Sequence, residues 1–246
     1  MVDVIKTVSH MHTVADQLRQ RGNRIGLVPT MGYLHEGHLS LVTQALQHAD
    51  QVVVSIFVNP IQFGPKEDLA AYPRDLDRDL KLITEAGAHF AYVPDVNEMY
   101  PDGFATYVNV EGLTDNLCGR SRPGHFRGVA TVVAKLFTAT KPHVAVFGQK
   151  DAQQVLVIQR MVRDLNLDVD VVVAPTIRES DGLAKSSRNV YLTPEARQEA
   201  PVLYRALQLG KSLIEGGVRD AGQVLGAMRN LIAEAPHAQI DYVEAD

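Results

Sequence analysis

The sequence predicts an α/β fold: a Rossmann-like parallel sheet with helices on both faces, followed by a smaller C-terminal α+β domain. Residues 52–58 and 143–147 form near-continuous apolar runs of the kind found in parallel strands buried on both faces. Segments with apolar residues at helical spacing separate such runs, which is the order of βαβ units. The 246 residues suffice for one large and one small domain, which we place at residues 1–176 and 177–246.

Composition and charge argue against several classes of protein. A hydrophobic content of 46% is enough for a packed core and excludes wholesale disorder. The net charge of −5, without a long basic block, argues against a nucleic-acid partner. The single cysteine, Cys118, permits neither an intramolecular disulfide nor a thiolate zinc cluster. The sequence has no signal-peptide pattern and no apolar run of bilayer length, so we expect a cytoplasmic protein without a membrane partner.

The first strand and the second helix meet at a glycine-containing turn. Residues 9–21 predict an amphipathic helix, and residues 25–28 follow as an apolar strand that Pro29 is expected to end. From Leu39 onward, apolar residues recur at helical spacing, so the next helix begins close to Gly37. Because a helix N-terminus offers free N–H groups and the positive end of the dipole, this turn predicts a phosphate site.

Two histidines, His35 and His38, lie at the start of this helix. Residues three apart project to the same side of a helical turn, and an imidazole there can donate to phosphate oxygens as a leaving group departs. A partial zinc site is one alternative, but zinc needs three or four ligands. The other alternative is a solvated helix start without a functional role.

The strand at residues 52–58 leads into a loop with two amide side chains, Asn59 and Gln62. Ligands of parallel sheets bind at the carboxyl ends of the strands, so we expect these amides to face the same crevice as the histidines. Residues 73–86 then predict a surface helix whose alternating charges we assign to a solvated face. These charges are Arg74, Asp75, Asp77, Arg78 and Asp79.

The middle of the chain is expected to contain short strands at residues 90–93 and 107–110 and a helix at residues 129–138. The polar, glycine-rich loop at residues 120–128 precedes this helix and carries Arg122. A guanidinium in this loop can bind a phosphate or a carboxylate. The alternative is a loop charge that faces only solvent.

A second strand-to-helix junction follows the strand at residues 143–147. Gly148 ends the strand, and Lys150 and Asp151 stand at the start of the next helix. Lys150 can neutralise phosphate, and Gln154, one turn later, can reach a polar substrate. The pattern is weak by itself but repeats the arrangement of the first junction.

A long polar loop follows a strand expected to be buried at residues 169–173. It holds the cations Lys185 and Arg188, which can stabilise charge on a triphosphate if the loop folds over it. A mobile surface loop is the alternative, although long loops in compact domains tend to be functional. The remaining elements expected are helices at residues 194–215 and 221–235 and a strand at residues 239–244 that lacks a partner.

The run from Pro29 to His38 resembles the nucleotidyltransferases with a His-x-Gly-His motif, and in particular the pantothenate synthetase (pantoate–β-alanine ligase) family. The resemblance covers five blocks in order between residues 24 and 192, with a weaker match at residues 241–244. It implies ATP-dependent ligation of (R)-pantoate and β-alanine to pantothenate through a pantoyl adenylate, with release of AMP and pyrophosphate. It also implies Mg²⁺, a C-terminal domain that acts as a lid, and a homodimer.

The resemblance also implies roles for individual residues. His35, His38, Lys150 and Arg188 would carry the catalysis, with His38 in the family's proton-donor role. Gln62 would contact both pantoate and β-alanine, Gln154 would contact pantoate, and Asn59 and Arg122 would line the same pocket. No metal ligand is assigned. The ATP site would consist of Pro29, Met31, Gly32, Tyr33, Leu34, His35, Glu36, Gly37, His38, Gly148, Gln149, Lys150, Asp151, Ile177, Lys185, Ser186, Ser187 and Arg188.

Two departures from the family pattern and two alternative functions remain. Gln149 replaces the family's usual acid before the lysine, and family members continue some tens of residues beyond Asp246, so we expect an incomplete C-terminal domain. An enzyme that transfers AMP to a phosphorylated cofactor would share the first motif but would not need Gln62 and Gln154. A non-catalytic nucleotide sensor is disfavoured because every charged position expected to perform chemistry is present.

Overall fold

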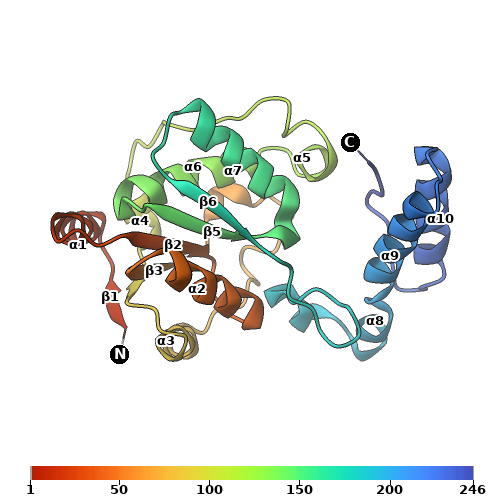
Figure 1. The fold of residues 1–246 in the computed structure, drawn as a ribbon, viewed down its shortest axis with the longest axis horizontal. Coiled ribbons are helices and arrows are strands. Elements are labelled where there is room, and N and C mark those ends of the chain that lie inside the picture. Colours follow the sequence, from red (N-terminus) through yellow and green to blue (C-terminus); the bar gives the residue numbers. More distant parts are fainter. Residues whose placement is uncertain (1, 246) are drawn as a thin grey trace. The chain divides into compact units, whose positions relative to one another are not determined.

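The computed structural model describes residues 2–245 and divides into two compact units, Met1–Thr176 and Ile177–Asp246. Within the described residues, the first unit contains a six-stranded sheet with the order β1-β4-β3-β2-β5-β6, in which all neighbouring strands are parallel (Figure 1). The strands are β1 (Asp3–Ile5), β2 (Ile25–Thr30), β3 (Gln51–Ile56), β4 (Phe90–Tyr92), β5 (Val144–Gly148) and β6 (Asp170–Ala174).

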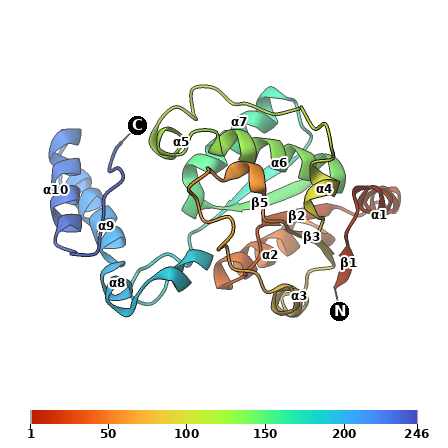
Figure 2. The same ribbon diagram turned by 180° about the vertical axis from the view of Figure 1, so that it is seen from behind.

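Helices cover both faces of this sheet, as the sequence predicted (Figures 1 and 2). The buried side chains of α1, α6 and α7 form one apolar cluster with Leu27 and Val53 of the sheet. Those of α2 and α3 form a second cluster with Val28 and Val54 on the opposite face. The helices and short helical turns are α1 (Val8–Gln20), α2 (Glu36–His48), η1 (Pro60–Gln62), α3 (Leu76–Glu85), α4 (Val96–Met99), α5 (Leu117–Ser121), α6 (His125–Thr140), η2 (Gln149–Asp151) and α7 (Ala152–Asp164).

The order of the strands creates a switch point between β2 and β5. From β2 the chain passes through α2 to β3 on one side, whereas β5, on the other side of β2, leads through α7 to β6. In doubly wound sheets the ligand crevice lies outside the carboxyl ends of the strands at such a point. The two strand-to-helix junctions singled out in the sequence therefore meet at the usual ligand edge of the sheet.

Several predicted elements were wrong in detail. Pro29 does not end its strand, because β2 continues to Thr30 in register with β3. Its pairing with β5 ends earlier, at Leu27, so Pro29 has a strand neighbour on only one side and its missing N–H is tolerated. Residues 107–110 form no strand; there the Val108 N–H donates to the Thr131 hydroxyl instead. The strand expected at residues 169–173 is β6, a partly exposed edge strand.

The second unit is helical within its described part, where no strand longer than a bridge occurs. Its elements are η3 (Ser187–Tyr191), α8 (Pro194–Glu199), α9 (Val202–Glu215) and α10 (Ala221–Ala233). Helices α9 and α10 pack through an apolar cluster that includes Ala206 and Ile232, and Gly210 allows close approach because a Cβ there would lie 2.7 Å from the Met228 sulfur. The strand predicted at residues 239–244 is not formed. Among the described residues, no helix is long and apolar enough to cross a membrane.

Candidate active site

The turn between β2 and α2 has an unusual backbone that is held by the side chains of Thr30 and Asp79. Gly32 and Tyr33 both adopt left-handed conformations, with φ of 82° and 50°. The Thr30 hydroxyl accepts from the Gly32 N–H at 3.2 Å and donates to the Ser55 carbonyl at 2.7 Å. The next two N–H groups of the turn donate to the carboxylate of Asp79. The turn therefore enters α2 along a defined path.

The two histidines form a reciprocal cap at the start of α2. His35 is the N-cap residue, and its Nδ1 accepts from the Gly37 N–H at 3.1 Å. The Nδ1 of His38 accepts from the His35 N–H at 3.3 Å, and the two rings lie 4.1 Å apart between centroids. Because both Nδ1 atoms accept, a neutral ring at either position carries its proton on Nε2. The pair can thus present two N–H donors to an anion.

Burial, the neighbouring His35 and the positive charge of Lys150 lower the pKa of His38 to about 3. The imidazole of His38 is therefore neutral at physiological pH. A neutral ring donates a hydrogen bond from Nε2 but is not an acid that can release a proton from a cationic form. The lowered pKa, together with an Nδ1 that already accepts a hydrogen bond, favours donation from Nε2–H over release of a proton by this side chain.

The second junction brings Lys150 to the same end of the sheet. Lys150 belongs to the short turn η2 after β5, and its ammonium group forms an ion pair with Asp151 at 3.1 Å. Its charge acts on His38, which places the two side chains in one electrostatic environment. Gln149 is exposed on the same turn, and Gln154 is half-buried on α7. The second junction therefore places Lys150 in the electrostatic environment of His38, with Gln149 beside it in the chain and Gln154 at the start of α7.

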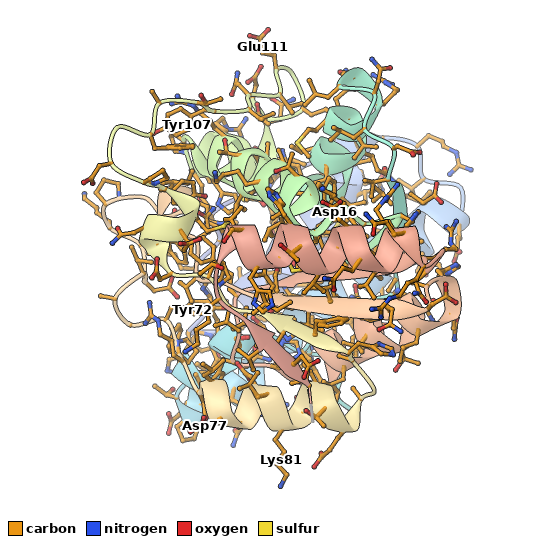
Figure 3. The ribbon with its side chains drawn as sticks, turned by 90° about the vertical axis from the view of Figure 1, so that its left-hand side faces the viewer. Asp16, Tyr72, Asp77, Lys81, Tyr107 and Glu111 are labelled. Atoms are coloured by element: carbon orange, nitrogen blue, oxygen red, sulfur yellow. The ribbon has the colours of Figure 1, made fainter. Side chains whose placement is uncertain are left out.

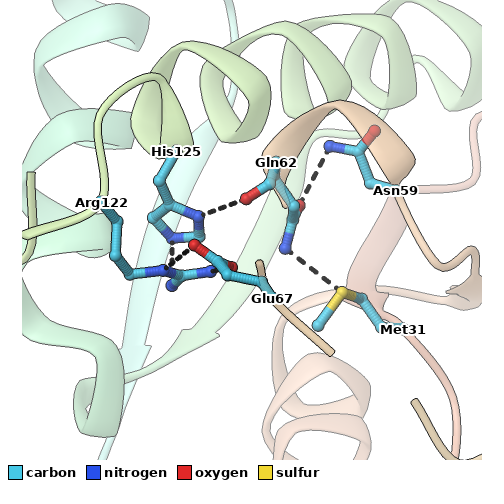
Figure 4. A network of polar contacts seen from close by, with 6 residues as sticks. All are labelled: Met31, Asn59, Gln62, Glu67, Arg122 and His125. Atoms are coloured by element: carbon cyan, nitrogen blue, oxygen red, sulfur yellow. Dashed lines mark hydrogen bonds and ion pairs between the residues drawn. The ribbon is translucent and has the colours of Figure 1, made fainter. Parts of the chain in front are cut away.

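The amides predicted to face the crevice form a connected network (Figure 4). Asn59 donates to the Gln62 side-chain oxygen at 3.0 Å and to the Gly128 carbonyl at 3.1 Å. The amide nitrogen of Gln62 donates to the sulfur of Met31, a residue of the β2–α2 turn, at 3.2 Å. Asn59 is buried, and its oxygen accepts from the Tyr100 hydroxyl at 2.7 Å. These bonds join the loop after β3 to the histidine turn.

Arg122 is held by a carboxylate of the protein itself (Figure 4). It forms a two-pronged ion pair with Glu67 and contacts His125 Nε2 at 3.1 Å. The Nδ1–H of His125 then donates to the Gln62 carbonyl at 2.9 Å. The hydrogen bond from Arg122 and the charge of the guanidinium lower the pKa of Glu67. Arg122 thus supports the backbone at Gln62 through His125.

The polar loop that carries Lys185 and Arg188 belongs to the second unit, and it makes contacts within that unit. Arg178 and Ala184 form an isolated antiparallel bridge, so residues 177–185 fold back on themselves. Lys185 forms an ion pair with Glu179 at 3.2 Å. The Ser186 hydroxyl caps the η3 turn by accepting from the Arg188 N–H at 3.3 Å. The remaining predicted residues of this loop, Ile177 and Ser187, lie in the same folded segment.

Sequence reasoning missed three residues that shape the site: Asp79, Glu67 and His125. The solvated face assigned to residues 74–79 was wrong at Asp79, whose side chain is 1% exposed. One signal existed, because Asp79 lies four residues before the buried Ile83 and so on the inner side of α3. Figure 3 shows the outer side of this helix, which carries Asp77 and Lys81.

Within residues 2–245, no group of three or more His, Cys, Asp or Glu side chains could hold a metal ion. The zinc alternative for the two histidines therefore lacks further protein ligands in the described part of the chain.

Comparisons with known proteins agree with this architecture. A family model described as "Pantoate-beta-alanine ligase" matches residues 3–246. The chain is 58% identical over 98% of its length to the pantothenate synthetase of Moorella thermoacetica, of which it covers 86%. The crystal structure of pantothenate synthetase from Thermus thermophilus matches with a TM-score of 0.93 and 51% identity, over 98% of this chain and 86% of that one. The ligase of Francisella tularensis, complexed with "Beta-gamma ATP and Beta-alanine", matches with a TM-score of 0.84 and 35% identity, over 96% and 86%.

Proposed function

Because the chain belongs to the pantoate–β-alanine ligase family, we propose that it joins (R)-pantoate to β-alanine through a pantoyl-adenylate intermediate. In the first step a pantoate carboxylate oxygen attacks the α-phosphorus of ATP, and pyrophosphate leaves. In the second step the amine of β-alanine attacks the acyl carbon, AMP leaves, and the amine loses a proton. The observation that carries this proposal is the convergence of His35, His38 and Lys150 at the ends of β2 and β5.

The chemistry requires positioning and charge stabilisation rather than a side-chain nucleophile. Negative charge develops on the phosphate oxygens as pyrophosphate departs, and donors placed in advance stabilise it. His35 and His38 supply N–H groups from Nε2, and Lys150 supplies a positive charge. The family resemblance implies a proton-donor role for His38. Because its pKa is low, we interpret this role as donation of a hydrogen bond from the neutral ring.

The amide network supports a binding site for pantoate. Gln62 currently donates to the Met31 thioether, a weak acceptor that a hydroxyl or carboxylate oxygen of pantoate can replace. Asn59 and the Arg122–His125 pair hold Gln62 from its side chain and its backbone. Because the holding contacts are internal to the protein, Gln62 is pre-organised before substrate arrives. Gln154, on α7, would add a second amide to pantoate.

The second unit would act as the lid of this site. In this proposal residues 1–176 bind ATP and pantoate, and residues 177–246 close over the adenylate and exclude water from it. Lys185 and Arg188 would then approach the phosphates from the lid. We also propose that the protein is a homodimer, which sedimentation analysis tests. Its proposed location is the cytoplasm, which cell fractionation tests.

Magnesium would arrive with the nucleotide. Mg²⁺ prefers oxygen ligands, keeps several waters, and often uses substrate phosphates plus one or two carboxylates. When bound, the ion would supply neutralisation of phosphate charge, and the protein's own donors would orient the same oxygens.

The test follows ATP consumption with pantoate present, with and without β-alanine. AMP and pyrophosphate formed in quantity only with both substrates, together with pantothenate, are expected. Pantoate-dependent exchange of pyrophosphate into ATP, without β-alanine, would support the adenylate. If ATP turnover shows no dependence on pantoate, the proposal is refuted and a cofactor adenylyltransferase or a nucleotide sensor becomes the better assignment.

A further inference from the structure

Asp79 is a buried carboxylate aimed at the histidine turn. It lies in the first part of α3, a helix that covers the second face of the sheet, and its side chain is 1% exposed. Its Oδ2 accepts from the Tyr33 N–H and its Oδ1 from the Leu34 N–H, both at 2.7 Å. The nearest cation, Arg78, lies 3.8 Å away and is itself partly exposed. The backbone of the turn is therefore the main partner of this charge.

The conformation of the turn explains why a carboxylate is needed there. Left-handed residues at Gly32 and Tyr33 point successive N–H groups to one side, which creates a small concave anion site in the backbone. Asp79 fills this site with two charge-assisted hydrogen bonds. Gly32 leaves room for it, since a Cβ there would lie 3.0 Å from Asp79 Oδ2 and 3.1 Å from Ile56 Cγ2.

The turn ends one residue before the histidine pair. Leu34 is fully buried and directly precedes His35, the N-cap of α2. The His35 N–H in turn donates to His38 Nδ1. A shift of the turn would therefore move the backbone of His35 and remove the contact that orients the ring of His38.

We propose that Asp79 is a positioning residue that holds the Gly32–Leu34 backbone so that His35 and His38 face the substrate phosphates. The proposal rests on the proposed function for its kinetic consequence, but its structural part does not. Burial raises the pKa of Asp79 above the usual range of an aspartate, against the effect of its two N–H donors. A charge kept in an unfavourable environment is typical of a functional site.

The test compares Asp79→Asn with Asp77→Asn, an exposed acid on the same helix. An asparagine presents only one oxygen, so one of the two N–H groups loses its acceptor. Hydrogen exchange followed by mass spectrometry should then show at least ~10-fold faster exchange in the peptide covering residues 31–38. Peptides from β3 and α6 should exchange as in the wild type. Asp77→Asn should match the wild type throughout.

The kinetic measurement is pantoate-dependent exchange of pyrophosphate into ATP. Asp79→Asn should lower kcat by about 10- to 100-fold with little change in the KM for pantoate, because the amides that bind pantoate lie on other elements. A merely structural role would instead raise hydrogen exchange across the whole first unit. It would lower the fraction of active enzyme without changing the kcat of the folded molecules. That pattern would overturn the proposal. It would also be overturned if the hydrogen exchange and the kcat of Asp79→Asn both equalled those of the wild type.

A second variant keeps the test decisive if Asp79→Asn does not fold. Gly32→Ala pushes the turn away from the carboxylate from the other side, and it should reproduce the local increase in exchange and the loss of kcat. Normal adenylation with a displaced turn in this variant would also overturn the proposal. If the wild type shows no pyrophosphate exchange, the proposed function is refuted. The structural part of the proposal is then judged by hydrogen exchange alone, because that measurement needs no substrate.

Discussion

His38 offers the sharpest test of the site, because it has a structural role and a chemical role that substitutions can separate. Its Nδ1 accepts from the His35 N–H, and in the proposed function its Nε2–H donates to the substrate. His38→Ala removes both contacts. His38→Gln restores an acceptor for the N-cap, since glutamine at the third helical position completes a capping box, but it removes the ring.

The expected magnitudes differ for the two roles. Loss of the cap should lower the free energy of unfolding of His38→Ala by about 1 kcal/mol, and most of this should return in His38→Gln. Loss of one donor to developing phosphate charge should lower the rate of adenylation by about 10²- to 10³-fold in both variants. His48→Ala, an exposed histidine at the other end of α2, is the matched control and should change neither quantity.

The pKa of about 3 adds a prediction with a definite sign. Between that value and the usual histidine pKa of 6.5, the unfolded chain binds a proton at this position and the folded chain does not. His38 therefore lowers stability as pH falls below 6.5, by about 1.4 kcal/mol per pH unit. When the pH falls from about 6.5 to about 5, the free energy of unfolding should decrease by about 2 kcal/mol less in His38→Gln than in the wild type. Denaturant unfolding at the two pH values measures this difference.

The assays are single-turnover formation of AMP-linked product from ATP and pantoate, together with the unfolding curves. Near-normal adenylation in His38→Ala would refute the role of this donor. An acid limb in the rate near pH 6.5 that disappears in His38→Gln would show that His38 titrates in the folded enzyme, and would refute the neutral ring.

Three further variants test other parts of the site. Glu67→Gln breaks the ion pair with Arg122 and should raise the KM for pantoate several-fold at nearly constant kcat. Urea unfolding should show a stability lower by about 1 kcal/mol. An unchanged KM would contradict the idea that Arg122 supports Gln62 through His125. Gly128→Ala places a Cβ 2.4 Å from the Ile61 carbonyl, so it should destabilise the fold by about 1–3 kcal/mol in the same measurement, and a stable variant would contradict the close packing. Lys150→Met should raise the KM for ATP and lower kcat in pyrophosphate exchange by about 10²-fold, and wild-type kinetics would remove Lys150 from the phosphate site.

The fold class could be predicted because its signals are local in the chain. Continuous apolar runs predicted the strands β3 and β5, and apolar residues at helical spacing predicted the helices α1 and α2. The same signals were insufficient where a strand needs a partner. Residues 107–110 and 239–244 have the composition of strands, but no neighbouring strand pairs with them, and an unpaired segment gains nothing from β propensity alone.

The family, the parallel sheet and the two junctions that carry His35, His38 and Lys150 could all be predicted before the fold was known. Motif spacing is enough for this, because a strand, a glycine turn and a helix start are consecutive in the chain. The partners of the buried charges, in contrast, become visible only in the folded protein. Asp79 is 46 positions from Tyr33, and Glu67 is 55 positions from Arg122, so the local pattern can place Asp79 on the inner side of α3 but cannot name the group that either carboxylate binds. The cost of burying a carboxylate without donors makes these distant contacts specific, and folding is what brings the donors to it.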